Sequence, residues 1–384
     1  MHSFWTILLG FVALIWVLQS LDAALGVRSL RSIADATPLS DADCPPVSIL
    51  FAARDEAEKM PGALETFLAL DYPRYEIVAV DDRSEDGTSR ILQDAAQKDP
   101  RVKAVRVNKL PAGWLGKPHA LQQAYQRSTG EWLIFTDADV HFAPDLLRRS
   151  IALAQREGWE HLTLLGNVKM VHPGEKIVLT FFAMSFVIGL KPWRVSNPRS
   201  SIYAGVGAFQ LIRRGAYERM GTHRRLAMEV VDDMKLGKLA KEAGIRSGAA
   251  KDGGAVNVRW HDGLGNIIRG TTKNFFATTG YRPWLACLQL AAMLLMFVMP
   301  WVALPFARGW ALASAATAVT LAIAAETGTA LEFGISPLYA ATVPMGALIF
   351  SWMLARSTIV TLWQGGVTWR GTFYPLEELK RGVV

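Results

Sequence analysis

The fold of this chain is decided by residues 75–96, which read YEIVAVDDRSEDGTSRILQDAA. The β-rich run Tyr75–Val80 leads into an acidic loop, and the loop leads into an amphipathic helical stretch, Ser84–Ala96. The same order of apolar run and polar loop or helix recurs on both sides, which is typical of a parallel sheet wrapped by helices. The pattern predicts an α/β domain over residues 45–280. The other expected strands are Val47–Phe51, Val102–Val107 and Glu131–Phe135, and a second helix is expected at Lys117–Gln126.

The composition excludes several classes of protein. Of the 384 residues, 51% are hydrophobic and 20% are charged, which excludes an intrinsically disordered chain. The mean hydropathy is +0.19 and the apolar residues are unevenly spread, which favours a membrane protein with a soluble part. The net charge of +7 is not concentrated in a run, so we expect a nucleotide or an anionic membrane face as partner and no nucleic acid. Because Cys44 and Cys287 lack metal-binding spacing and lie in different kinds of segment, neither a zinc site nor a disulfide framework is expected.

The N-terminal segment is predicted to be a membrane anchor. Residues 4–26 are almost entirely apolar and are long enough to cross a hydrocarbon core of about 30 Å. A cleaved signal peptide is the alternative, but no Lys or Arg precedes the apolar run, whereas Arg28 and Arg31 follow it. Since positive charge stays on the cytosolic side, we expect residues 1–30 to anchor a cytosolic domain in the inner (plasma) membrane, with the N-terminus outside.

Residues 281–365 are predicted to contain three further membrane-spanning helices. Charge-free segments cover residues 283–307, 310–325 and 338–355, and a basic tail follows at residues 366–384. Four spans would place the C-terminus outside, although the basic residues of the tail favour the cytosol. Either one C-terminal segment re-enters the membrane without crossing it, or the basic tail is tolerated outside.

Acidic residues follow two of the predicted strands. Glu56 comes shortly after the first strand, and Asp81 and Asp82 come directly after the second. Ligands of such sheets bind at the carboxyl ends of the strands, so these residues predict a crevice that accepts hydrogen bonds from a base and a ribose. The alternative is a helix N-cap formed by Ser84 or Asp86.

A second acidic motif, Asp137-Ala138-Asp139, follows the fourth predicted strand. Two carboxylates at this spacing can converge on one hard cation, which usually also binds substrate phosphates. Mg²⁺ or Mn²⁺ held by Asp137 and Asp139 would neutralise the charge of a diphosphate leaving group.

Two more motifs contain charged residues of the types that take part in reactions. Lys117 lies in a Gly- and Pro-rich loop that suits a phosphate, although the loop is not a Walker motif because Pro118 stands where Ser or Thr is required. Its alternative is a solvated lysine at a helix N-terminus. Asp232 and Asp233 begin another helix, where the helix dipole favours a carboxylate, but two together exceed what capping requires. Asp233 is therefore a candidate general base.

Taken together and in this order, the motifs resemble those of the membrane-bound family 2 glycosyltransferases with a GT-A (Rossmann-like) fold. Within that family the chain is most similar to lipid-modifying members, such as the ceramide glucosyltransferase-like and the hopanoid- or carotenoid-associated enzymes. The resemblance is strong over Val47–Gly237 and weaker over Asn266–Phe276 and Trp369–Pro375. The motifs are VSILFAARDE (47–56), VAVDDRSEDGT (78–88), GWLGKPHAL (113–121), FTDADV (135–140), GVGAFQLIRR (205–214) and VDDMKLG (231–237).

The resemblance implies a role for each candidate residue. It implies that Glu56 and Asp82 contact the uracil and ribose of a nucleotide sugar with Asp81 close by, and that Lys117 contacts its diphosphate. It further implies that Asp137 and Asp139 form a DxD motif in which Asp139 binds the metal. Asp233 would deprotonate the acceptor hydroxyl, next to Asp232 where many members have Glu.

The chain departs from the processive members of the family at Asn266–Gly270, which lacks the Gln and Trp of their QxxRW motif. His261 could be a third metal ligand, an acceptor contact or a structural residue. The resemblance therefore implies an inverting transfer of a hexose from a nucleotide sugar, with UDP-glucose as the expected donor, to a hydroxyl of a membrane lipid. The alternatives are a polysaccharide synthase and a nucleotide-sensing membrane transporter, for which Glu326 and Glu332 in or beside an apolar segment are the support.

The apolar stretch Ile177–Leu190 has a place in this hypothesis. It looks too short to cross a membrane, so it is either a buried helix or a helix in the membrane interface. Lys191, Trp193 and Arg194 follow it, and these residue types anchor a helix at the headgroup boundary. The interfacial alternative makes this stretch part of the entrance for the lipid acceptor.

Overall fold

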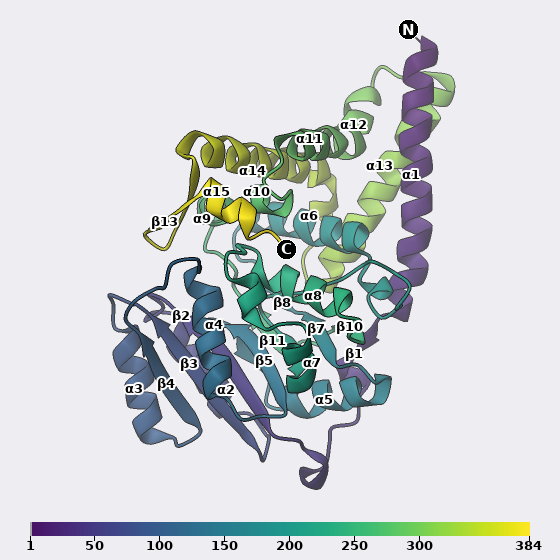
Figure 1. The fold of residues 1–384 in the computed structure, drawn as a ribbon. Coiled ribbons are helices and arrows are strands. Elements are labelled where there is room, and N and C mark those ends of the chain that lie inside the picture. The colour runs from purple at the N-terminus through teal and green to yellow at the C-terminus, as the bar shows by residue number, and fades with distance from the viewer. Residues whose placement is uncertain (1) are drawn as a thin grey trace.

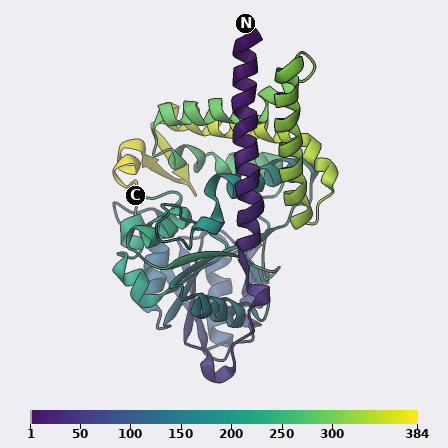
Figure 2. The same ribbon diagram turned by 90° about the vertical axis from the view of Figure 1, so that its right-hand side faces the viewer.

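The computed structural model describes residues 2–384, in which an α/β domain lies beneath a layer of apolar helices (Figures 1 and 2). The centre of the domain is an eight-stranded sheet with the strand order β1-β10-β7-β9-β5-β2-β3-β4. Only β9 runs antiparallel to its neighbours among the described strands of this sheet, so the predicted parallel α/β architecture is confirmed. The strands are β1 Arg31–Ser32, β2 Val47–Ala53, β3 Tyr75–Asp82, β4 Val102–Val107, β5 Trp132–Asp137, β7 His161–Leu165, β9 Gln210–Arg213 and β10 Ser247–Lys251.

Helices cover both faces of this sheet. The α2, α3 and α5 helices pack on one face, and α4, α7 and α8 pack on the other. Both faces are therefore buried, which is why the strands are continuous apolar runs rather than alternating ones. The helices are α2 Met60–Leu68, α3 Thr88–Lys98, α4 Gly116–Arg127, α5 Leu146–Glu157, α7 Arg214–Arg219 and α8 Asp232–Glu242.

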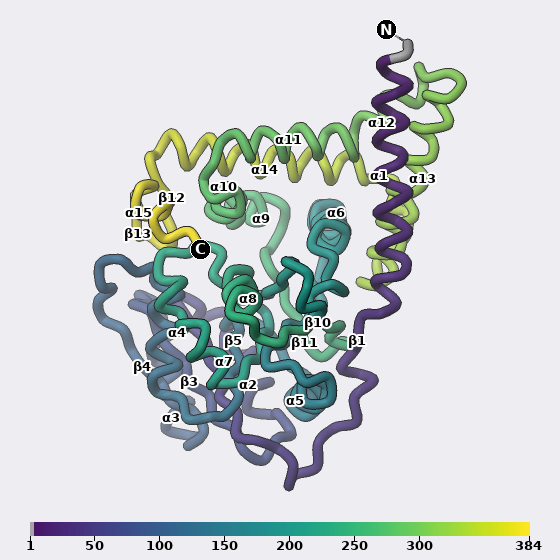
Figure 3. Tube along the Cα trace, turned by 45° about the vertical axis from the view of Figure 1, so that its right-hand side comes forward, coloured from purple at the N-terminus to yellow at the C-terminus, as the bar shows by residue number. Residues whose placement is uncertain are grey.

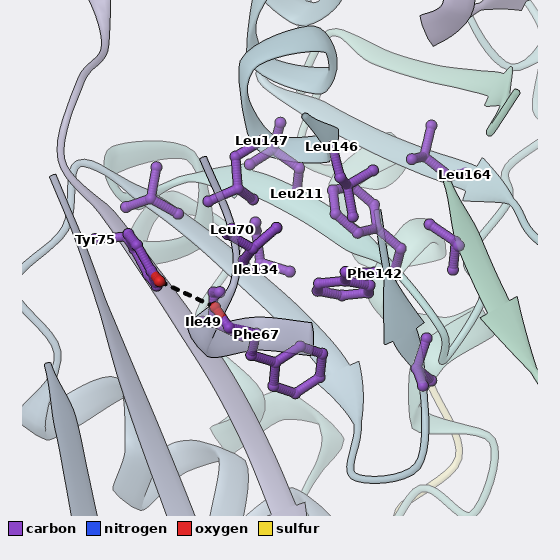
Figure 4. Close-up of a cluster of buried hydrophobic side chains, with 14 of the residues drawn as sticks. Ile49, Phe67, Leu70, Tyr75, Ile134, Phe142, Leu146, Leu147, Leu164 and Leu211 are labelled. Carbon is purple, nitrogen blue, oxygen red and sulfur yellow. Dashed lines mark hydrogen bonds between the residues drawn. The ribbon is translucent and has the colours of Figure 1, made fainter. Parts of the chain in front are cut away.

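The core on the α2 and α5 side shows how the strands are held (Figure 4). Ile49 of β2 and Ile134 of β5 are fully buried there, beside Phe67 of α2. The hydroxyl of Tyr75 donates a hydrogen bond of 3.0 Å to the carbonyl of Phe67, which ties the start of β3 to the end of α2. This packing holds the strands in register up to their carboxyl ends.

Shorter elements lie beside the main sheet and near the C-terminus. A three-stranded sheet has the order β6-β11-β8, and a two-stranded hairpin is formed by β12 and β13 near the C-terminus. The remaining elements are β6 His141–Phe142, β8 Asn167–Val168, β11 Val256–Val258, α9 Leu264–Thr271, α10 Phe275–Thr278, β12 Gly366–Trp369, β13 Thr372–Pro375 and α15 Leu376–Arg381.

The helical layer contains two groups of helices with different directions. The α1 and α13 helices pack along each other, whereas α11 and α14 run across them above the α/β domain (Figures 1 and 3). The α6 helix lies between α14 and the domain. The helices of the layer are α1 His2–Ser29, α6 Pro173–Leu190, α11 Pro283–Phe297, α12 Met299–Ala303, α13 Gly309–Glu332 and α14 Val343–Gln364.

Four segments of the described residues are helical, long and apolar enough to cross a membrane, and three of them match predicted spans, whereas Pro173–Arg194 takes the place of residues 283–307. Residues 283–307 form no single long helix, because α11 ends at Phe297 and α12 follows only as a short helix. At 1.5 Å per residue α11 measures about 22 Å, which is short for a hydrocarbon core of about 30 Å. The four candidates are Phe4–Ser29, Pro173–Arg194, Gly309–Glu332 and Pro337–Gln364.

The expectation that Ile177–Leu190 is too short to span was wrong. The helix α6 begins four residues earlier, at Pro173, where the proline occupies the first turn. The side chain of Glu175 accepts hydrogen bonds from the backbone N–H groups of Val171 (2.7 Å) and His172 (3.2 Å), which caps this earlier start. The first turn of α6 is polar, so it lies outside the apolar stretch from which the length of the helix was judged.

Candidate active site

The strands β2, β3 and β5 are neighbours, so the acidic segments that follow them meet at one edge of the sheet. In the register of the sheet, Asp81 of β3 lies opposite Ala53 of β2, and Asp137 of β5 lies opposite Ala52. Because parallel strands end at the same edge, the sequence-predicted residues Glu56, Asp81, Asp82, Asp137 and Asp139 gather there.

The Asp82 corner of this edge is tightly packed. Asp82 is buried and its carboxylate accepts hydrogen bonds from the Arg83 guanidinium at 2.8 and 3.0 Å. A Cβ on Gly116 would stand only 2.2 Å from Asp82 Oδ2, so a glycine at the start of α4 is required for this approach. A cavity of about 440 Å³ adjoins the corner and is lined by Arg83, Trp114 and Tyr374, among others.

Asp81 lies at the edge of the sheet and also binds the loop that follows β3. Its Oδ1 accepts a hydrogen bond of 3.0 Å from the backbone N–H of Ser84, and its Oδ2 lies 3.6 Å from Arg106. The N-cap position of α3 is Gly87, and neither Ser84 nor Asp86 occupies it. Asp86 still accepts a hydrogen bond of 2.9 Å from the N–H of Thr88, the first residue of α3, so the capping alternative holds in part.

Lys117 lies among the carboxylates of the site. Its Nζ is 2.7 Å from Asp137 Oδ1 and 3.9 Å from Asp232 Oδ1. Burial by itself would lower the pKa of Lys117, but the charges of Asp137, Asp232 and Asp233 outweigh burial and raise it. The lysine is therefore a fixed positive charge, and not the solvated lysine of the alternative interpretation.

Gly207 brings the DxD motif and the α8 helix together. A Cβ on this glycine would lie 2.7 Å from Asp137 Oδ2 and 3.1 Å from Asp233 Oδ2. The carboxylates of Asp137 and Asp233 therefore face the same point from two elements that are distant in sequence. Any larger residue at Gly207 would push them apart.

The two aspartates of the DxD motif are in different electrostatic states. Burial would raise the pKa of Asp137, but Lys117, Lys273 and Arg370 lower it. Asp139 has a more distant ion pair, with Lys59 at 4.0 Å. Its pKa is raised to about 6 by burial and by the neighbouring charges of Asp137 and Glu56.

This concentration of negative charge tests whether a metal ion fits the site. Asp137 and Asp139 offer carboxylate oxygens, the donors that Mg²⁺ and Mn²⁺ prefer. A cation between them would relieve the repulsion that raises the pKa of Asp139. The residues present therefore fit a divalent metal.

The α8 helix begins at Asp232, so Asp232 and Asp233 lie early in a helix, as predicted. Asp232 is buried and its pKa is raised by burial, against the attraction of Lys117, and further by Asp233 and Asp137. Asp233 is more accessible, and its Oδ1 accepts a hydrogen bond of 2.8 Å from the Met234 N–H. Of the two carboxylates, Asp233 is thus the more accessible.

Sequence reasoning missed two charged residues of the site, Lys273 and Arg370. Lys273, between α9 and α10, lies with its Nζ 3.8 Å from the centre of the Trp369 ring. Burial and the nearby Lys117 lower the pKa of Lys273 to about 8, although Asp232, Asp233 and Asp137 oppose this. Arg370, at the tip of the β12–β13 hairpin, forms an ion pair with Glu56. The weak resemblance around Asn266–Phe276 and Trp369–Pro375 was the only signal for them.

His261 lies beside this group, near the cations Lys59, Lys273 and Arg370. Its ring stacks on Trp260 with centroids 5.6 Å apart. Its pKa is lowered to about 4 by burial and then by Lys59, Lys273 and Arg370, so the ring is neutral at neutral pH.

Another group of possible metal ligands, His172, Glu175 and Asp262, lies at the start of α6. Arg259 already pairs with Glu175 at 3.5 Å and with Asp262. Glu175 also accepts a hydrogen bond of 2.6 Å from the Gly263 N–H. This group is therefore accounted for by the capping of α6.

Comparison with known proteins agrees with this geometry. Residues 48–221 match the model of the family described as glycosyl transferase family 2. A β-monoglucosyldiacylglycerol synthase of Synechocystis is 33% identical over 147 residues, which cover 35% of this chain and 30% of that protein. A 4,4'-diaponeurosporenoate glycosyltransferase of Staphylococcus haemolyticus is 23% identical over 230 residues, which cover 59% of this chain and 60% of that protein. The chain thus spans less than two thirds of the length of these relatives.

A solved structure is also similar in outline: a mannosyltransferase of Pyrobaculum calidifontis in complex with GDP-Man and Mn²⁺, with a TM-score of 0.49 and 21% identity, covering 93% of this chain and 99% of that one. The argument for kinship comes from the family model, whose matched residues contain β2, β3 and β5 together with Glu56, Asp82 and the DxD motif. The α/β domain that these residues form thus matches the model of glycosyl transferase family 2.

Proposed function

We propose that the protein transfers a hexose from a nucleotide sugar, specifically UDP-glucose, to a hydroxyl group of a membrane lipid, with inversion at the anomeric carbon. The observation that carries the proposal is the meeting of the DxD motif and Asp233 at Gly207. The α8 helix, which carries Asp233, lies beneath the helical layer (Figure 1). The two relatives, a monoglucosyldiacylglycerol synthase and a diaponeurosporenoate glycosyltransferase, support a lipid acceptor.

The donor would bind across the strand ends. Glu56 and Asp82 would accept hydrogen bonds from the base and ribose, with Asp81 supporting the loop. The cavity beside Arg83 has a volume of about 440 Å³, within the range of about 300–1,000 Å³ that is usual for small-molecule sites.

The diphosphate would lie among the cations at the centre of the site. Lys117 would exchange part of its pairing with Asp137 for the phosphate oxygens, and Lys273 lies close enough to act on the same carboxylates. A divalent metal held by Asp137 and Asp139 would supply neutralisation of the developing diphosphate charge. With these groups in place the leaving group is stabilised on one side of the sugar.

The base would act from the opposite side. Asp233 would accept the proton of the acceptor hydroxyl while its oxygen attacks the anomeric carbon and the bond to the diphosphate breaks. A single displacement of this kind inverts the anomeric configuration. Because Asp232 is buried beside Lys117, its role would be to hold that lysine rather than to receive the proton.

We further propose a multi-pass location in the inner membrane with the catalytic domain in the cytosol. At the domain end of α1, Asp22 pairs with Lys191 and Arg194, both at 2.7 Å, and Arg28 follows. Positive charge at this end supports a cytosolic side for the domain. Glu332, which supported the transporter alternative, pairs with Lys251 of β10 at 2.8 Å and thus serves to attach α13 to the sheet.

The test is to incubate membranes that contain the protein with labelled nucleotide sugars, in parallel reactions with UDP-glucose, other UDP-hexoses and GDP-mannose. Label in the organic extract, strongest with UDP-glucose, is the expected result, and NMR of the product should show an inverted anomer. Label in insoluble polymer would favour the polysaccharide synthase instead. Label in neither fraction would contradict a transferase.

A further inference from the structure

The α14 helix is attached to the catalytic side along its whole length. Near its start, a Cβ on Gly346 would stand 2.6 Å from the Cβ of Phe181 in α6, so the two helices cross in close contact. Two turns before its end, the Ser357 hydroxyl donates a hydrogen bond of 2.6 Å to the Thr272 carbonyl and accepts one of 2.9 Å from the Phe276 N–H. The only charged residue of α14, Arg356, points the same way and donates to Thr272 Oγ1 at 2.7 Å.

The opposite face of α14 is apolar and exposed. Its side chains recur at the spacing of one helical face, and Trp352 and Trp363 are 57% and 86% exposed. The neighbouring helix α11 carries the same kind of face, with Trp284 and Leu288 exposed and no charged residue in the helix. We call the two helices the platform. The exposed large apolar residues of the platform are Trp284, Leu288, Leu294, Met345, Leu348, Trp352, Ile359, Leu362 and Trp363.

The chain leaves the platform once and comes back. From α11 it continues through α12 to the end of the molecule farthest from the sheet, where Ala311 and Ala315 of α13 pack against Leu9 of α1. The helix α13 then returns to the sheet, where Glu332 pairs with Lys251. After α14, Arg370 reaches Glu56. The C-terminal hairpin therefore lies on the same side as the catalytic domain.

The platform lies at a defined distance from the end of α1 that is next to the α/β domain. Trp16 of α1 donates a hydrogen bond of 3.1 Å to the carbonyl of Met296, at the end of α11. Asp22, with its basic partners, lies six residues further along α1, which is about 9 Å at 1.5 Å per residue. Helices that lie in the plane of a membrane are buried about 5–10 Å below its headgroup boundary, which is the same depth.

We propose that α11 and α14 lie in the plane of the membrane, within the leaflet next to the catalytic domain, with their exposed face against the acyl chains. Only α1 and the α12–α13 arm then reach the opposite leaflet. This placement resolves the conflict between four spans and a basic C-terminal tail, because α14 begins and ends on the catalytic side. The partner of this surface is a lipid bilayer. The inference rests on the proposed membrane function, and the experiment separates the two.

The decisive measurement is the depth of spin labels in the purified full chain, reconstituted in phospholipid vesicles. Labels are attached to cysteines at Leu288, Leu348, Trp352 and Ile359 in a Cys287→Ser background, and depth is read from oxygen and nickel-chelate accessibility by EPR. The expected depths agree to within about 5 Å, whereas a crossing α14 would separate Leu348 from Ile359 by about 16 Å. Each labelled variant is also assayed for nucleotide binding, since all four side chains are exposed and distant from the site.

Exposed positions along α1 provide the matched control. Labels at Leu14, Leu18 and Leu25 should differ in depth by about 1.5 Å per residue if α1 crosses. Label depths that change along α1 but agree across the platform support the inference. Label depths that change along both α1 and α14 overturn the inference but not the proposed membrane function. Labels on α1 that are accessible to water throughout overturn both.

A second measurement checks the side of the C-terminal hairpin. Single cysteines at Asp94, Phe306 and Glu377 are treated with a membrane-impermeant maleimide in vesicles of known orientation. Asp94→Cys and Glu377→Cys should react from one side and Phe306→Cys from the other. Reaction of Glu377→Cys from the side of Phe306→Cys would show that α14 crosses and would overturn the inference.

Discussion

The sheet domain and the platform have opposite patterns of burial. In the domain, strand residues such as Ile49 and Leu50 are fully buried, and carboxylates gather at the strand ends. In the platform, the larger side chains of α14 such as Trp352 and Trp363 point outward, and its single arginine points inward. The difference indicates that the two regions face different solvents. The domain is built for water and a charged ligand, and the platform is built for hydrocarbon.

The largest effect is expected from a change at the acidic edge of the sheet domain. We expect Asp139→Ala to abolish turnover, because the carboxylate would hold the divalent metal, while the fold survives since Asp139 lies partly exposed beyond the strand. Turnover of labelled donor and the thermal unfolding midpoint measure the two effects. Asp145→Ala, which removes an exposed carboxylate that pairs with Arg149, should leave turnover intact. Activity retained in Asp139→Ala, or wild-type activity that is insensitive to EDTA, would contradict the metal assignment.

A second change separates the paired carboxylates of α8. Asp233→Asn should lower kcat by about 10²–10⁴-fold, the usual range for loss of a positioned base, while nucleotide affinity is preserved. Asp232→Asn is the matched variant, and it should act mainly on the position of Lys117, 3.9 Å away. If Asp232→Asn causes the large drop in kcat and Asp233→Asn is nearly silent, the base has been assigned to the wrong residue.

The boundary between the two regions can be tested on α6. Phe182 and Phe186 are partly exposed, with ring centroids 6.0 Å apart, whereas Phe181 is fully buried against the helical layer. The double variant Phe182→Asp, Phe186→Asp should lose more than about tenfold of lipid turnover by obstructing the acceptor entrance, yet keep UDP binding and a folded domain. Phe181→Asp should unfold the protein, because it buries a charge in the core.

The outcome for the double variant decides between the two interpretations of α6. Unfolding of the double variant as well, measured by thermal denaturation, would make α6 an ordinary core helix. The acceptor entrance would then have to lie elsewhere in the helical layer.

A smaller effect is expected at Lys117. Loss of a charge-assisted hydrogen bond costs about 1.5–3 kcal/mol, so Lys117→Ala should weaken UDP binding by roughly 10–100-fold and affect kcat less. Titration of UDP against the purified protein measures this. Lys98→Ala, at the end of α3, removes a lysine outside the site and should bind UDP normally. Unchanged UDP affinity in Lys117→Ala would end the claim that this lysine contacts the diphosphate.

The last expected effect, which is confined to acidic pH, concerns the stability of the domain. Burial lowers the pKa of His161 from 6.5 to about 4 in the folded state. Below pH 6.5 the unfolded chain binds a proton that the folded chain refuses, so the contribution is complete above pH 6.5 and is lost as the pH falls toward 4. His161 should contribute a slope of about 1.4 kcal/mol per pH unit in this window. Urea unfolding of His161→Asn should show a shallower pH dependence, and the exposed His141→Asn should match the wild type in slope.

Much of the fold and of the site was predictable because it depends on local pattern. The strand Val102–Val107 was predicted at its observed bounds, and Tyr75–Val80 was short by only two residues. Continuous apolar runs for strands, amphipathic stretches for helices and carboxylates after strands all lie within stretches of about ten residues. Once neighbouring parallel strands are accepted, Glu56, Asp82 and Asp137 must meet at one edge.

The tertiary structure decided whatever depends on contacts between distant segments. The positions of Lys273 and Arg370 depend on helices and a hairpin that return to the sheet after more than a hundred residues, and the paired approach of Asp137 and Asp233 depends on Gly207. Likewise, apolar composition cannot tell a crossing helix from one that lies flat, since both need only an apolar surface. The direction of α14 is set by the contact of Gly346 with Phe181 and by the hydrogen bond of Ser357 to Thr272. Close packing and buried hydrogen bonds fix the orientation of a helix, whereas the hydrophobic effect has no direction.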